Sequence, residues 1–285
     1  MKIINYSELT PELARAGCFV LDMPNDAYHA YDGISKSGLD KVAKSPAHYF
    51  LSAHSEPTAA MRMGTIAHTA VLEPERFREE YVLLRGITDK RKTEYKEAVK
   101  VHGADNVLTE KEAAQVVSLQ ESISANMGAS NALLECNMFE VSAFIEINGV
   151  ICRCRYDALN IDTGVSVDLK TTRCSERESF SKSVFDFRYH VQDAFYSAVF
   201  EQITGKPLRF KFLAVENEPP HCPMVYELDQ EAKQYGRMEA ERDLQTFSDA
   251  LDANEWKGYE QTNEPLTLPG WALARYESEL DEGIV

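Results

Sequence analysis

Two acidic residues and a lysine in the middle of the sequence have the composition of a metal site. Asp168 and Lys170 are separated by one residue, and Asp157 precedes them in what reads as the preceding strand. Side chains alternate across a strand, so Asp168 and Lys170 point the same way. If the two strands are neighbours, both carboxylates converge on one hard cation with the lysine beside it. Two carboxylates plus waters suit Mg²⁺, which seldom receives a full protein cage.

A cation at this point would serve the hydrolysis of a phosphodiester. It polarises the scissile phosphate and activates the attacking water. Lys170 could orient or deprotonate that water and offset the phosphate charge. The competing interpretation is a structural ion pair at a strand end, which the short pattern alone leaves open. A charged trio on a central strand is costly to desolvate unless it is paired or binds metal.

Other polar residues could join this trio. Glu140 begins the first predicted strand and could supply a third carboxylate. Gln192 and Tyr196 lie four residues apart and share a helix face, where they could hold a phosphate, a base or the lysine. His68 shares a face with Gly64 on an earlier helix. The alternatives are ordinary amphipathic packing for the helix pair and a satisfied core histidine for His68.

The elements that position these residues change from helical to strand periodicity near residue 140. Residues 140–147 and 150–159 are predicted strands, joined by Asn148-Gly149, a strong two-residue hairpin signal. A third strand spans residues 165–171, and a helix spans about 184–204. The remaining predicted elements are an irregular segment at 1–33 with a short helix at 8–16, a helix capped by Ser37, a turn begun at Pro46, helices at 59–72, 88–100 and 110–126 (the last with a capping box at Thr109), strands at 208–215 and 224–227, a helix at 230–253, and a Pro-rich tail with Trp271.

The composition is that of an ordinary globular chain. Its 285 residues are 44% hydrophobic and 27% charged. No apolar run approaches the roughly 18 residues of a membrane span, and the first residues lack a secretory signal, so we expect a cytoplasmic protein without membrane contact. The six cysteines form no Cys-x-x-Cys pair, which argues against a zinc ribbon. Walker-type, His-Glu-x-x-His and nucleophile-elbow motifs are also absent from the sequence.

The net charge of -16 opposes nucleic-acid binding but is unevenly spread. Residues 1–100 are balanced, whereas residues 201–285 hold 8 Lys/Arg against 18 Asp/Glu. Because screening limits distant charges to roughly 10 Å, acidic outer faces are compatible with a basic channel. The cluster 90–92 is expected to be a solvated helix face. The candidate phosphate contacts are Arg153, Arg155, Arg173, Lys182 and Arg188, of which two or three are expected to be ordinary surface residues.

Taken in order, these residues resemble a known family. The ordered set is Gly64-x-x-x-His68, Glu140, Asp157, Asp168-x-Lys170 and Gln192-x-x-x-Tyr196. It resembles the RecB-like branch of the PD-(D/E)XK nuclease superfamily, and within it the RecE (exonuclease VIII) type of nuclease domain. The segments 152–157, 167–172 and 188–197 look like that domain's central strands and following helix. The resemblance covers nearly the whole chain; one departure is Tyr156, where the superfamily name expects a structural proline.

The resemblance implies an α/β (α+β) fold, with a restriction-endonuclease-like mixed central sheet flanked by helices and an N-terminal helical segment. It implies one nuclease domain over residues 1–285: a mostly helical part at 1–135, the catalytic sheet and helix at 136–228, and a C-terminal helix and tail at 229–285. The implied activity is Mg²⁺-dependent (Mn²⁺ as a substitute), 5′-to-3′ digestion of one strand of linear duplex DNA, which exposes single strands for recombination by annealing.

The resemblance also implies roles and partners. Asp157 and Asp168 would be metal ligands, with the backbone carbonyl of Leu169 a further one and His68 lining the metal site. Lys170 would activate the water. The remaining catalytic helpers would be Glu140, Gln192 and Tyr196. The implied partners are double-stranded DNA ends, a single-strand annealing protein of the RecT type, and further copies of the chain in a ring, a tetramer in preference to a trimer. The source would be bacterial or phage-encoded.

Two kinds of alternative stay open. On the same fold, the chain could be an endonuclease or a helicase-associated nuclease, which the order of motifs does not separate. In a different class, it could be a non-catalytic DNA-end-binding protein or an acidic interaction module. The intact trio of Asp157, Asp168 and Lys170 argues against a dead site, because decay usually removes one of them.

Overall fold

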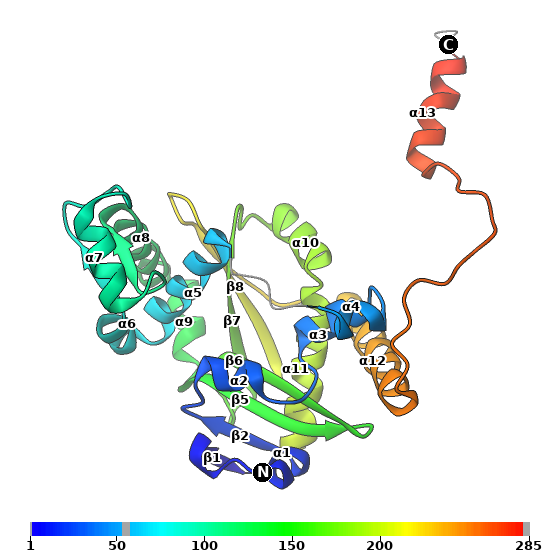
Figure 1. The fold of residues 1–285 in the computed structure, drawn as a ribbon, viewed down its shortest axis with the longest axis horizontal. Coiled ribbons are helices and arrows are strands. Elements are labelled where there is room, and N and C mark those ends of the chain that lie inside the picture. The colour runs from blue at the N-terminus through cyan, green and yellow to red at the C-terminus, as the bar shows by residue number, and fades with distance from the viewer. Residues whose placement is uncertain (1, 53–57, 282–285) are drawn as a thin grey trace.

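A seven-stranded mixed sheet forms the centre of the computed structural model, which describes residues 2–52 and 58–281 (Figure 1). The strand order is β1-β2-β5-β6-β7-β8-β9. The pairs β1–β2 and β7–β8 are parallel, and the other neighbours are antiparallel. The predicted mixed sheet is therefore confirmed. The strands are β1 (Ile3–Asn5), β2 (Cys18–Leu21), β5 (Met138–Ile147), β6 (Val150–Asn160), β7 (Val165–Thr172), β8 (Arg209–Glu216) and β9 (Pro223–Tyr226).

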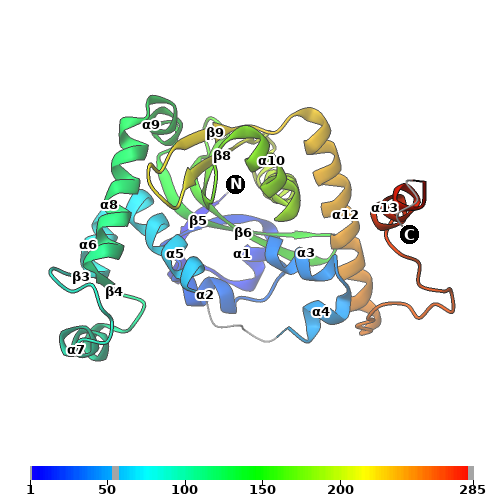
Figure 2. The same cartoon turned by 90° about the horizontal axis from the view of Figure 1, so that it is seen from above.

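Helices cover both faces of this sheet, as predicted. Seen from above, α3, α4 and α12 lie on one side and α5, α8 and α9 on the other (Figure 2). The first group packs, with α10 and α11, on a core that includes Tyr156, Phe200 and Phe210. The second group packs on Val167 and Leu169. These helices are α3 (Lys36–Val42), α4 (Pro46–Phe50), α5 (Ala59–Leu72), α8 (Glu110–Ala125), α9 (Met127–Leu134), α10 (Arg177–Asp186), α11 (Tyr189–Thr204) and α12 (Gln230–Ala253).

The β5–β6 hairpin confirms the prediction made from Asn148 and Gly149. Both residues have positive φ, 52° and 77°, as the tight two-residue turn requires. The next pair of strands behaves differently. β6 and β7 pair only from Ala158↔Val167 to Asn160↔Val165, although β7 continues to pair with β8 through Thr172. The two strands therefore separate at Asp157, and the opening between them is the place where the polar side chains gather.

The first 33 residues are more regular than predicted. β1 and β2 add two strands to the sheet, with a short helix α1 (Pro11–Ala16) between them and α2 (Asn25–Ala30) after them. The prediction missed β2 because Cys18, Phe19 and Val20 are all fully buried, so this strand has no alternating pattern. A smaller correction concerns α3, which is capped by the side chain of Ser35, the acceptor of the Gly38 amide, and not by Ser37.

The predicted helix at 184–204 is also wrong in its extent. The structure has two helices, α10 and α11, broken at Arg188, whose φ of 52° is left-handed. The guanidinium of Arg188 bonds the carboxylates of Asp40, Glu239 and Asp243. These partners come from α3 and α12, far away in sequence, so no local pattern could reveal the break.

The segment between α5 and α8 forms a small unit beside the sheet (Figure 1). It contains α6 (Pro74–Glu80), the parallel pair β3 (Val82–Leu84) and β4 (Val107–Thr109), and α7 (Thr93–His102). The two short strands were not predicted, and α7 begins and ends later than the predicted helix. The capping box at Thr109 is confirmed, because its side chain and that of Glu112 bond each other's backbone amides.

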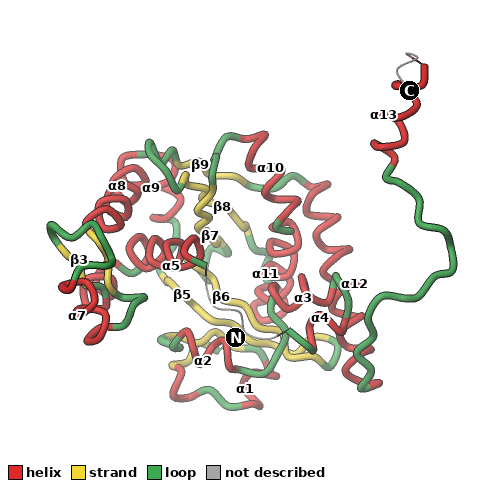
Figure 3. Tube along the Cα trace, turned by 45° about the horizontal axis from the view of Figure 1, so that its top comes forward, coloured by secondary structure: helices red, strands yellow, loops and turns green. Residues whose placement is uncertain are grey.

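The C-terminal segment departs from the predicted tail. After α12, residues 254–269 run without helix or strand and lead to α13 (Gly270–Asp281), which stands away from the rest of the chain (Figures 1 and 3). Within the described part of the chain, no helix has the length and apolar character needed to cross a membrane.

Candidate active site

Asp157 occupies the point at which β6 and β7 part. Its neighbour Ala158 still pairs with Val167, but beyond this pair the strands diverge. The amide of Leu169 donates a 2.8 Å hydrogen bond to Oδ2 of Asp157. A carboxylate oxygen thus replaces the missing strand partner, so that Asp157 is held in a fixed position between two strands.

Two further potential ligands converge on Asp157. The ligand atoms of His68, Glu140 and Asp157 all lie within 4.8 Å of one another. His68 comes from α5, which lies against β6 and β7, and its Nδ1 is 3.4 Å from Oδ2 of Asp157. Gly64, one turn earlier on α5, faces β7, and a Cβ there would make an ordinary 3.5 Å contact with Thr171 Oγ1. The structure thus brings together three residues that the sequence placed far apart.

The backbone of Glu140 is unusual. Its neighbours pair in unbroken register, Phe139↔Ala158 and Val141↔Tyr156, which places Glu140 opposite Asp157. Glu140 has a left-handed φ of 50° within this strand. For a residue other than glycine such a conformation costs about 1–3 kcal/mol, and such strain concentrates at functional sites. The strain supports the inclusion of Glu140 in the site.

Asp168 is held by two other polar side chains. It is 2% exposed. Nε2 of Gln192, from α11, donates to its Oδ1 at 2.5 Å, and the ammonium of Lys170 lies 2.5 Å from its Oδ2. Asp168 and Lys170 therefore share a side of β7, as predicted, and Gln192 fixes the orientation of the carboxylate.

The charges of this cluster oppose one another. Burial, and then the charge of Asp168, raise the pKa of Asp157, and burial with the charge of Asp157 raises the pKa of Glu140. Burial alone would lower the pKa of Lys170, but Asp168 and Asp157 outweigh it and raise the pKa of the ammonium. The lysine is therefore held in its charged form, which suits orienting water and offsetting phosphate charge better than removing a proton.

These residues fit a divalent cation. Close, partly buried carboxylates that repel one another are relieved by a positive ion, and carboxylate oxygens are the ligands preferred by Mg²⁺ and Mn²⁺. His68, Glu140 and Asp157 would hold the ion, with Asp168 the neighbouring carboxylate. Leu169 contacts Asp157 through its backbone amide. That its backbone carbonyl is a further metal ligand stays a prediction.

Tyr196 lies one turn beyond Gln192, with its ring in the aromatic core. The ring packs edge-on against Tyr156 and Phe210, with centroids 5.3 and 5.8 Å apart. The hydroxyl of Tyr156, which stands where the superfamily name expects proline, donates to the carbonyl of Tyr196 at 2.8 Å. This contact ties α11 to β6. Burial raises the pKa of Tyr196, and Tyr28 and Cys154 add more to that rise than Asp168 and Asp157 do.

Arg153 and Arg155 are engaged within the chain. Both guanidiniums lie over the ring of Tyr28, at 4.9 and 4.4 Å from its centroid. Arg153 donates to the carbonyls of Tyr28 and Gly33, and Arg155 to the carbonyl of Met23. Their cationic groups thus secure the segment around α2 against the sheet, which accounts for them without DNA.

Of the other three predicted phosphate contacts, one is engaged within the chain and two are exposed. Arg188 is committed to the three carboxylates at the break between α10 and α11. Arg173, directly after β7, is exposed and has no ion-pair partner among the described residues, and Lys182 is exposed on α10. Of these predicted contacts, Arg173, which directly follows the strand that carries Asp168 and Lys170, is placed to meet a phosphate at the site.

Two residues near Lys170 were not predicted as site residues. The Lys170 ammonium lies 4.8 Å from the ring centroid of Tyr189, and the Lys36 ammonium 5.8 Å from the same centroid. Neither has a sequence signal of its own, because the contacts depend on how α3 and α11 meet the end of β7.

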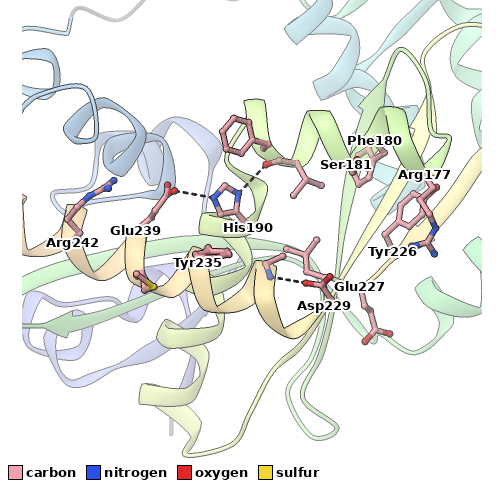
Figure 4. Close-up of a pocket in the computed structure, with 15 residues that line it drawn as sticks. Arg177, Phe180, Ser181, His190, Tyr226, Glu227, Asp229, Tyr235, Glu239 and Arg242 are labelled. Atoms are coloured by element: carbon pink, nitrogen blue, oxygen red, sulfur yellow. Dashed lines mark hydrogen bonds and ion pairs between the residues drawn. The ribbon is translucent and has the colours of Figure 1, made fainter. Parts of the chain in front are cut away.

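One large cavity lies apart from the acidic cluster. It measures about 890 Å³ and runs between α10, β9 and α12 (Figure 4). Its lining is mainly apolar and aromatic, with Phe180, Tyr226 and Tyr235. His190 and Glu239 face each other at its edge, with 3.6 Å between Nε2 and a carboxylate oxygen (Figure 4). Its lining contains none of the proposed metal ligands, so this cavity is not the candidate active site.

The fold and the cluster together define a class of protein. A mixed sheet flanked by helices, with carboxylates and a lysine where two strands part, is the architecture of the PD-(D/E)XK nuclease superfamily. Within it, a sequence model described as "PDDEXK-like domain of unknown function (DUF3799)" matches residues 35–264, and the chain belongs to this family. The predicted superfamily is therefore confirmed, and the finer RecE-type assignment stays a prediction.

A solved structure has the same fold. The crystal structure of a protein from Eubacterium rectale, named a "Putative exonuclease", superposes with a TM-score of 0.56. The two chains are 15% identical, and the likeness covers 87% of this chain and 96% of the other. At this identity the likeness establishes the fold alone. No curated protein matches the sequence.

Proposed function

We propose that this chain is a metal-dependent exodeoxyribonuclease that digests one strand of linear duplex DNA from the 5′ end. The observation that carries the proposal is the opening between β6 and β7, where His68, Glu140 and Asp157 face one another and Asp168 pairs with Lys170. The name of the Eubacterium rectale protein supports an exonuclease over an endonuclease, and the RecE resemblance supports the direction.

The chain's own residues would divide the work. A bound Mg²⁺ supplies polarisation of the phosphate and a more acidic water. Lys170, kept charged by its carboxylate neighbours, orients the attacking water and offsets the negative charge of the phosphate. Gln192 keeps Asp168 from rotating, and Asp157 is fixed by the Leu169 amide. Positioned charges therefore do most of the catalysis.

The partners extend this proposal. DNA ends reach the site past Arg173, the exposed cation directly after β7, and Lys182 is a further exposed cation on α10. The RecE resemblance further supports a ring-shaped homo-oligomer, a tetramer in preference to a trimer, which acts in the cytoplasm with an annealing protein.

The proposal is tested on two substrates, linear duplex DNA and covalently closed circular DNA, with Mg²⁺, Mn²⁺ or EDTA. We expect digestion of the linear DNA alone, lost with EDTA and in Asp168→Ala. Removing Asp168 takes away the carboxylate beside the ion and the partner that holds Lys170, so the rate should fall thousands-fold or more. Asp252→Ala, which changes an exposed carboxylate on α12, is the matched control and keeps full activity.

Other outcomes would change the conclusion. Nicking of the closed circle would indicate an endonuclease. Binding of DNA ends without digestion would leave the non-catalytic end-binding protein. The direction is read from duplexes labelled at one 5′ end or one 3′ end, and release of the 3′ label first would overturn the proposed polarity.

A further inference from the structure

The turn between α10 and α11 exposes an aromatic ring next to the candidate active site. Phe187 is 59% exposed, yet its ring stacks on that of Tyr189, with centroids 5.6 Å apart and planes inclined by 29°. The Tyr189 ring in turn lies beneath the Lys170 ammonium at 4.8 Å. An exposed phenyl face is therefore one ring removed from the lysine that pairs with Asp168.

The backbone that presents this ring is strained and firmly held. Arg188 follows with a left-handed φ of 52°, a conformation that costs about 1–3 kcal/mol for such a residue. Three carboxylates hold its guanidinium, and the ammonium of Lys36 donates to the carbonyl of Phe187 at 2.5 Å. Asp40 serves both cations, at 2.8 Å from Lys36 and 3.1 Å from Arg188.

Such an arrangement needs a reason beyond packing. A single exposed apolar side chain is ordinary on any surface. Here, however, two helices distant in sequence, α3 and α12, supply the charged groups that keep the turn in its strained form. The turn therefore holds the Phe187 ring in a fixed position at the edge of the site, with more than half of it exposed.

We propose that Phe187 stacks on a nucleobase of the DNA strand whose phosphate lies at Lys170. This inference rests on the proposed function, and it adds a base contact to a site otherwise built for phosphate and metal. Aromatic side chains stack on any base, because every base has a π-face. The contact would therefore hold the strand end without preferring a sequence.

The test compares Phe187→Ala with the unaltered chain on two sets of duplexes. One set is intact, and the other carries a single abasic nucleotide at successive positions from the 5′ end. Loss of one stacked base lowers kcat/KM by about 5- to 150-fold. We expect this loss on intact duplexes and no further loss on the duplex whose abasic nucleotide removes the contacted base.

Two variants control for folding and for exposed aromatic rings in general. Phe187→Trp keeps a stacking face and should retain activity. Phe185→Ala removes a ring that is 73% exposed on α10 but stacks on His190 at the edge of the cavity, so it should leave kcat/KM unchanged.

The outcomes separate the two proposals. If the unaltered chain digests DNA but Phe187→Ala loses nothing, or loses equally on intact and abasic duplexes at all positions, the stacking proposal is overturned alone. If the unaltered chain digests no duplex, the proposed function is overturned and the stacking proposal falls with it.

Discussion

Replacing Glu140 by glutamine should stabilise the metal-free chain while abolishing cleavage. Glu140 sits opposite Asp157, and burial together with that neighbour's charge raises its pKa. Its ionised form is therefore disfavoured in the folded chain and free in the unfolded one. Glutamine has the same shape without the charge, so it removes the repulsion and leaves the packing in place.

The sign and size of the effect depend on pH. A carboxyl whose folded pKa lies above its unfolded value of about 4.3 lowers stability progressively as pH rises from that value to the folded pKa. Near pH 4.5 the two proteins should therefore be equally stable. Burial and Asp157 raise the pKa of Glu140 to about 8. Each unit above the unfolded value is worth about 1.4 kcal/mol, so by pH 8 we expect the glutamine variant to be more stable by up to about 5 kcal/mol.

Urea unfolding in EDTA at pH 4.5 and pH 8 measures this difference. Glu241→Gln, an exposed position on α12, controls for the loss of charge and should change neither value. Added Mg²⁺ should reverse the order, because it stabilises the unaltered site and not the variant. Equal stability of the two proteins at pH 8, or a less stable Glu140→Gln, would refute the reasoning that Glu140 and Asp157 repel each other.

Three further changes test the neighbours of the cluster. Gln192→Leu removes the hydrogen bond that orients the Asp168 carboxylate and should lower the cleavage rate about 10- to 100-fold. In a titration of activity with Mg²⁺, the half-saturating Mg²⁺ concentration should rise by a similar factor. An unchanged titration would show that Gln192 is not part of the site. His68→Ala should raise the half-saturating Mg²⁺ concentration about tenfold or more in the same titration, and an unaltered midpoint would show that His68 holds no metal. Arg188→Ala removes the cation that three carboxylates share and leaves the buried Asp243, which is 2% exposed, with Arg242 alone, so it should lower the free energy of unfolding in urea by about 3 kcal/mol. Full stability would show that the left-handed turn does not depend on this cation.

The sequence predicted those parts of the fold that are set locally. The Asn148-Gly149 turn and the two strands beside it follow from short-range pattern, as do α5, the capping box at Thr109 and α12. In the site, Asp168 and Lys170 share a side of β7 because side chains alternate across a strand. A single sequence is enough to predict this. Their partner Gln192 was also named, from its position on a helix face.

Long-range contacts account for the rest. Arg153 and Arg155 look like free cations in the sequence, but the carbonyls and ring that occupy them come from residues 23–33. The break at Arg188 depends on carboxylates of α3 and α12. Tyr189 was overlooked because its contact with Lys170 exists only where α11 meets β7. A pattern of a few residues carries no information about such partners.

The bond between Asp157 and the Leu169 amide also constrains how the chain can change over generations. This carboxylate closes the gap between β6 and β7, so losing it leaves an unmatched backbone donor as well as an incomplete site. Lys170 has no such second duty in the sheet. If a descendant of this protein lost catalysis but kept the fold, we therefore expect Lys170 to be replaced before Asp157. Asp157 would be retained for the fold after the activity had gone.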